Sequence, residues 1–142
     1  MPADVAALPV EFLFSMHLNL GKMLVLPGGP HGTRVFVNVL GGDVSGPRIT
    51  AIVHPNSGAD WVHVRSDGFS QLDVRLTMAT EDGAVISMEY KGILGSGPDR
   101  RPRTAPLFQT GHERYQWLNN VQGVAIGTPG VDAVTYEVYA LL

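Results

Sequence analysis

The segment from Gly46 to Gly92 decides the fold: GPRITAIVHPNSGADWVHVRSDGFSQLDVRLTMATEDGAVISMEYKG. Apolar and polar residues alternate from Phe69 to Ala79 and again from Ala84 to Gly92, which predicts two β-strands with unlike faces. Asp67-Gly68 and Asp82-Gly83 precede and follow the first of them. Asp-Gly pairs close antiparallel hairpins because glycine accepts the positive φ that the turn needs. The segment therefore predicts an antiparallel meander.

Strand patterns continue on both sides of this segment. Gly41-Gly42-Asp43 is expected to turn the chain, and His112 to Asn120 to form one helical turn or to begin another strand. Further strands are predicted at Val10–Leu20, Thr33–Leu40, Leu107–Thr110, Val121–Ile126 and Val134–Leu142, the last two joined around Thr128-Pro129-Gly130. About eight to ten strands with little helix must pack on each other or close, and closure removes exposed edges. We expect an all-β, closed antiparallel β-barrel spanning residues 10–142, after a flexible lead-in of residues 1–9.

Composition limits the classes of function. The chain has 142 residues, a formal net charge of −3 and no cysteine, which argues for one domain, against nucleic acid as a partner and against disulfides. The N-terminus lacks a basic region typical of a signal peptide, and no apolar run is long enough to span a membrane. We expect a soluble, cytoplasmic protein with no membrane partner.

Several short motifs resemble those of the domain of unknown function 3237 family. They run in the same order over most of the chain: Gly46-Pro47, Gly58-Ala59-Asp60-Trp61, Asp67-Gly68, Leu72-Asp73 with Arg75, Asp82-Gly83-Ala84, Thr104-Ala105-Pro106 with Phe108, Thr110-Gly111, and Tyr115 with Trp117-Leu118-Asn119. The resemblance implies a closed antiparallel β-barrel. It also implies a loose link to aromatic polyketide chemistry, since some fungal relatives belong to such pathways.

Polar residues gather on one face of several strands, and two interpretations stay open. The polar faces lie in water, as in most antiparallel barrels, or they line a cavity while the apolar faces meet another subunit. In the second case Asp73 is the candidate general base and Arg75 the anion clamp, because the two are neighbours on one strand face. In the first case they form a weak surface pair. His17 and His54 are candidate second proton carriers.

Other side chains are candidates for substrate binding. Aromatic rings can stack on a planar ligand, and the family motifs add polar neighbours, which gives the set Asp60, Trp61, Glu89, Tyr90, Tyr115, Trp117 and Asn119. No nucleotide, flavin, haem or metal motif is present, so we expect no cofactor and no metal.

The sequence thus favours a small-molecule-binding β-barrel that works as a cofactor-independent acid–base enzyme. The reaction would be that of a lyase, isomerase, cyclase or hydrolase on an aromatic or polyketide-like substrate. Two alternatives remain: a barrel that carries a ligand without turning it over, and a structural oligomer with a filled core. Residues with apolar character on both strand faces, Val35, Phe36, Val37 and Val39, favour a homo-oligomer.

Overall fold

Ten β-strands and one short 3₁₀ helix make up residues 6–142, the part of the chain that the computed structural model describes. In chain order they are β1 (Val10–Gly29), β2 (Gly32–Ser45), β3 (Thr50–Val53), β4 (Gly58–Val64), β5 (Ser70–Ala79), β6 (Val85–Leu94), β7 (Arg103–Thr104), β8 (Leu107–Gln109), η1 (Glu113–Asn120), β9 (Gly123–Gly130) and β10 (Ala133–Leu141). The all-β prediction, the strand number and the low helix content are confirmed.

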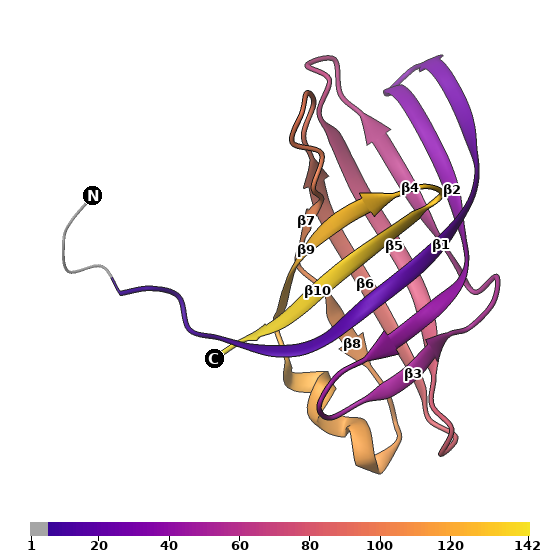
Figure 1. The fold of residues 1–142 in the computed structure, drawn as a ribbon. Helices are drawn as coiled ribbons and strands as arrows, with labels where there is room; N and C mark the ends of the chain where they lie inside the picture. Colours follow the sequence, from indigo (N-terminus) through magenta and orange to yellow (C-terminus); the bar gives the residue numbers. More distant parts are fainter. Residues whose placement is uncertain (1–5) are drawn as a thin grey trace.

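All ten strands belong to one antiparallel sheet that curls around a common interior (Figure 1). Eight strands pair in a ring in the order β5, β4, β2, β1, β10, β9, β7, β6 and back to β5. β3 adds to β2 and β5, and β8 adds to β6. The strand pairing around the ring is shortest at β7, whose two residues form two residue pairs with β6 and two with β9.

The apolar face of each strand points to the interior of the ring. On β5 the buried residues Leu72, Val74, Leu76 and Met78 alternate with more exposed polar ones, and the turns that flank β5 have Gly68 and Gly83 at φ of 88° and 91°. The core contains residues from all around the ring, among them Phe14, Met16, Leu18, Val39, Ile86, Met88, Tyr136 and Val138. The choice between the two faces is therefore settled: apolar side chains fill the interior and most polar ones face water.

The interior is packed at one end and open at the other. Near η1, the inward side chains of Phe14, Met16 and Leu118 are 0% exposed, and η1 lies across this end of the ring (Figure 1). At the opposite end, β1 and β2 extend as an arm, defined here as residues 20–29 and 32–39 (Figure 1). Met23 and Val25 lie on the same face as the interior side chains but are 64% and 60% exposed. The inner face of the arm is therefore open to solvent.

Several predicted boundaries are wrong. The expected turn at Gly41-Gly42-Asp43 is absent, because β2 continues to Ser45 while pairing with β1. A Cβ on Gly42 would lie 1.9 Å from the carbonyl oxygen of His17, so this glycine permits a close approach of two strands instead of a turn. β1 likewise continues past Leu20 to Gly29 through a bulge near Lys22.

The end of the chain also differs from the predicted strand limits. The last hairpin turns at Val131 and Asp132, and Thr128–Gly130 are still part of β9. Residues 113–120 form the helical alternative that the sequence left open. The first five residues of the expected lead-in lie outside the described part of the chain. In residues 6–142 no helix is long and apolar enough to cross a membrane.

Candidate functional site

One acidic residue, Asp60, lies among the inward-facing apolar residues of the ring. On β4, Asp60 pairs with Val37 of β2 and with Val74 of β5, both of which are buried on the interior face. Directly opposed residues of antiparallel strands share a face, so the Asp60 side chain also starts from the interior face. It is half-buried and lies toward the arm end.

Burial changes the chemistry of this carboxyl group. Desolvation raises the pKa of Asp60 to about 6, the charge of Asp73 adds to the rise, and a hydrogen bond from the Asp73 amide opposes it. That amide donates to Asp60 Oδ1 at 3.1 Å. Asp60 is therefore held by the backbone of the neighbouring strand and can gain or lose a proton near neutral pH.

Two tyrosines extend this polar group across the interior. The rings of Tyr90 on β6 and Tyr136 on β10 meet edge to face with centroids 5.3 Å apart, and both residues are buried. Burial raises the pKa of both hydroxyls, and the negative charge of Asp60 raises both further. The interaction between the two hydroxyls raises the pKa of Tyr90 further and lowers that of Tyr136. Both phenols thus stay protonated over the physiological pH range.

A hydroxyl without a partner lies beside the tyrosines. Thr104 of β7 is 7% exposed and pairs with Gly92 of β6 and Ala125 of β9, so it shares the interior face. Within residues 6–142, its Oγ1 is the buried side-chain atom that finds no hydrogen-bond partner. A buried hydroxyl in that condition costs about 1–3 kcal/mol unless a bound molecule satisfies it.

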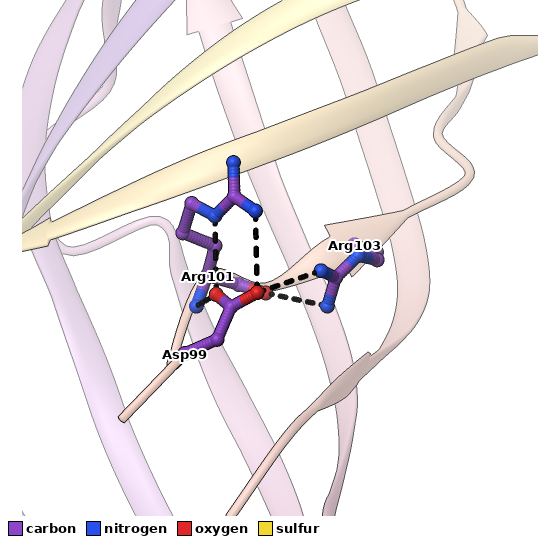
Figure 2. Close-up of polar contacts among 3 residues, drawn as sticks. All are labelled: Asp99, Arg101 and Arg103. Carbon is purple, nitrogen blue, oxygen red and sulfur yellow. Dashed lines mark hydrogen bonds and ion pairs between the residues drawn. The ribbon is translucent and has the colours of Figure 1, made fainter. Parts of the chain in front are cut away.

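Charge pairs hold the segment before β7 together, and a backbone hydrogen bond joins this segment to β9. Asp99 accepts hydrogen bonds from the Arg101 side chain at 3.1 and 3.2 Å and from Arg103 at 3.0 Å (Figure 2). These bonds lower the pKa of Asp99 well below its usual range. Pro102, between the two arginines, accepts a hydrogen bond from the Gly127 amide at 2.8 Å. The segment is thus internally bonded.

The predicted base and its clamp are not brought into the interior. Asp73 and Arg75 lie on the outer face of β5, where Arg75 is 4.0 Å from Glu89 of β6 and both side chains are largely exposed. Trp61, on the outer face of β4, is 57% exposed. Among the residues singled out from sequence, Asp60 and Tyr90 both lie on the interior face, one on each side of Val74.

The two predicted proton carriers also lie away from the interior. His17 is on the outer face of β1, with Nδ1 2.9 Å from the Thr135 hydroxyl. His54 follows β3 in a turn, is exposed, and has Nδ1 3.3 Å from the carbonyl oxygen of Pro55. The structure therefore places neither histidine near Asp60.

The remaining predicted contacts belong to the η1 end. Asn119 binds both backbone groups of Thr110, accepting from its amide at 2.8 Å and donating to its carbonyl at 2.9 Å. Tyr115 donates to Asp82, whose pKa is lowered to about 2 by bonds from Thr80, Arg114 and Tyr115. Trp117 carries the guanidinium of Arg48 3.7 Å above its ring. These contacts tie η1 to the ring beside an open cleft of about 720 Å³.

Two residues of the interior group were missed from sequence. Tyr136 stands in the alternation Val134, Tyr136, Val138, Ala140, a signal that was available because a tyrosine among inward apolar residues needs a polar partner. Thr104 had no such signal, since it lies in a two-residue strand. Across the described residues, no three histidine, aspartate or glutamate side chains gather closely enough to hold a metal ion.

The fold and the interior group define a class: a small all-β protein whose strand ring holds an ionisable carboxyl and two tyrosines. A model of the family described as "Protein of unknown function (DUF3237)" matches residues 8–141. The chain belongs to this family, as its motifs indicated.

Relatives and solved structures agree with this assignment. A UPF0311 protein of Rhodopseudomonas palustris is 30% identical over 150 residues, covering 95% of this chain and 97% of the relative. A crystal structure of a protein of unknown function from that organism has a TM-score of 0.89 at 29% identity and covers 97% of this chain and 100% of its own. A β-barrel-like protein of Acinetobacter baumannii has a TM-score of 0.88 at 24% identity over 99% of both chains, which shows the fold alone.

A relative with a named activity comes from a fungus. The hydroalkoxylation enzyme phnH of Penicillium herquei is 31% identical over 121 residues, covering 84% of this chain and 73% of the relative. A crystal structure of an enzyme from the same fungus covers 100% of both chains with a TM-score of 0.75 at 26% identity. This chain is therefore similar to a protein with a named enzymatic activity.

Proposed function

We propose that this protein is a cofactor-independent acid–base enzyme that adds the O–H bond of a substrate hydroxyl group across a carbon–carbon double bond of the same small, largely apolar or aromatic molecule. The observation that carries the proposal is Asp60, a carboxyl group with a pKa of about 6 on the interior face beside two tyrosines. The similarity to a hydroalkoxylation enzyme supports the reaction type.

The ring would work as a closed β-barrel with one functional mouth. The two short pairings through β7 complete the circuit of strands, and η1 covers the opposite end. At the arm end the interior face offers the apolar side chains of Met23, Val25 and Val37 next to Asp60. An apolar entrance with a few polar groups beyond it suits an aromatic or polyketide-like molecule that carries oxygen.

The reaction needs only proton transfers. As the substrate oxygen forms its bond to one alkene carbon, the O–H bond breaks and the Asp60 carboxylate takes the proton. The protonated Asp60 then gives a proton to the other alkene carbon, which consumes the π bond and restores the carboxylate. No electron is gained or lost overall, so side chains can supply all the chemistry. Tyr90 and Tyr136 stay protonated and share one hydrogen bond, so one of the two hydroxyls would be left to donate to a substrate oxygen, as would Thr104.

The experiment uses phenols that carry an alkenyl side chain as probes. The expected result is loss of the alkene signal in NMR spectra with no change in mass, and incorporation of one deuterium on carbon when the reaction runs in D₂O. Asp60→Asn should abolish turnover, whereas Asp73→Asn on the outer face should leave it unchanged. The reverse pattern would restore Asp73 as the base.

Two other results would decide against an enzyme of this type. Probes that bind to the interior without turnover in the unaltered protein would favour the alternative, a carrier barrel. Phenols that neither bind nor react would remove the aromatic substrate class. Asp60→Asn should leave the circular dichroism spectrum unchanged, so that lost turnover is not lost folding.

A further inference from the structure

The outer surface of the sheet near the arm carries an apolar patch that the proposed reaction does not use. The strand registers place two rows of outward side chains across five strands: Leu24, Phe36, Trp61, Asp73 and Lys91 in one row, and Leu26, Arg34, His63, Gln71 and Ile93 in the next. We call the apolar members, Leu24, Leu26, Phe36, Trp61 and Ile93, the outer patch.

The outer patch is exposed to an unusual degree. Leu24 is 60%, Trp61 57%, Leu26 44% and Ile93 39% exposed. Trp61 is nevertheless held in one orientation, because the Phe36 ring packs against it edge to face at 5.3 Å. An ordered, exposed tryptophan surrounded by aliphatic side chains is typical of the centre of a protein interface.

We propose that the outer patch binds a second copy of this chain about a two-fold axis that passes near Phe36. In this arrangement Leu24 and Leu26 of each copy cover Trp61 of the other. Beside Trp61 lies a shallow hollow of about 540 Å³, lined by Arg34, Gln71, Asp73 and Lys91 among others. The protruding arm and the hollow are parts of the same surface, so two copies can each offer one and receive the other.

The size of the surface fits a pair of identical chains. The four exposed apolar side chains present on the order of 400 Å² per chain, about half of the roughly 800 Å² per partner of a standard interface, and the exposed polar side chains of Gln71 and Lys91 lie between them. The hollow is lined by charges of both signs, the positive Arg34 and Lys91 and the negative Asp73. Two copies that meet here would therefore not bring together two surfaces of uniform like charge.

The arm has a second property that suits association. β10 pairs with β1 only as far as Asn19, and the last bond on that side runs from the Leu20 amide to the Asp132 carbonyl. Within residues 6–142, the β1 edge from Gly21 to Gly29 therefore has no strand beside it. A free apolar edge is an aggregation hazard unless something covers it, and a second copy would shield it.

The test is the molar mass in solution, measured by light scattering and sedimentation equilibrium. Measurements should run from about 1 to about 300 μM, because interfaces of this size range from micromolar to picomolar affinity. The expected mass is twice 15.3 kDa. Trp61→Lys and Leu24→Lys should each give the monomer mass. Val85→Lys, at an outward position on β6 with 64% exposure but outside the patch, is the matched control and should stay a dimer.

A second readout guards against variants that fail to fold. Trp61→Phe keeps an aromatic ring and should remain a dimer. In Trp117→Phe, Trp61 is the single remaining tryptophan, and its fluorescence emission should shift to longer wavelength on dilution because dissociation exposes it to water. A monomer mass for the unaltered protein at the highest concentration overturns the proposal. So does a dimer that survives both lysine substitutions.

Discussion

Replacing Asp60 with asparagine should make the protein more stable at pH 8 and leave its stability at pH 4 nearly unchanged. Asparagine has the same shape, and its side-chain oxygen can still accept the 3.1 Å hydrogen bond from the Asp73 amide. The substitution therefore removes one property, the ability of the side chain to ionise. Any gain in stability at high pH measures what ionisation costs the folded protein.

The magnitude follows from the pKa. In the unfolded chain the carboxyl titrates near 3.8, and in the folded protein near about 6. Between these values the folded state keeps a proton that the unfolded state has lost, so the stability of the unaltered protein falls as pH rises through this window. At about 1.4 kcal/mol per pH unit the full cost is at most about 3 kcal/mol. Because Asp60 is only half-buried, solvent screening reduces it to roughly 1–3 kcal/mol.

The assay is urea unfolding followed by tryptophan fluorescence at pH 4 and pH 8. At each pH the free energy of unfolding of the unaltered protein is subtracted from that of Asp60→Asn. The value at pH 4 is then subtracted from the value at pH 8, so that the titration of other groups cancels. Asp43→Asn, at an exposed position of β2, is the control and should give a value near zero. A value below about 0.5 kcal/mol for Asp60→Asn, within the spread of ordinary surface substitutions, would refute the reasoning that burial raises this pKa.

Three further substitutions and one control test other parts of the structure by the same unfolding assay. Gly42→Ala should cost about 3 kcal/mol or more, because its Cβ would lie 1.9 Å from the His17 carbonyl oxygen, whereas Gly111→Ala, with no atom within 4 Å, should change stability by less than about 0.5 kcal/mol. Thr104→Val should stabilise the ligand-free protein by about 1 kcal/mol, since it removes a buried hydroxyl without a partner; a loss would show that the hydroxyl has one. Leu118→Ala should cost about 2–5 kcal/mol because Leu118 is fully buried where η1 meets the core.

The sequence predicted the local structure better than the position of the site. Period-two alternation and Asp-Gly turns are local properties, so β5 and β6 came out with nearly correct limits. The prediction of a turn at Gly42 was wrong because glycine occurs both where the backbone needs a positive φ and where two strands approach closely. The register with β1 shows that the close approach applies here. The limits of β1 failed for a related reason, since a bulge interrupts the alternation without ending the strand.

The candidate site depended on which face of the strands is inside, and alternation alone cannot decide that. Asp73 and Arg75 were attractive because they are two apart on one strand, yet Val74 between them is buried in the core, which puts both charged neighbours outside. Asp60 was predicted for a substrate-binding role, but its raised pKa could not be anticipated because it comes from burial by distant strands. Tyr136, 76 residues further along the chain, reaches the same interior only through the ring.

The contrast between the two ends of the interior has a consequence for how this protein can change. Along β1, fully buried Phe14 and Met16 near η1 give way to Met23 and Val25, which are more than half exposed. Substitutions near η1 leave cavities and cost several kcal/mol, whereas those at the arm remove little buried surface. Mutation can therefore change the arm end at small cost to folding, so members of such a lineage can differ there while their cores stay nearly constant.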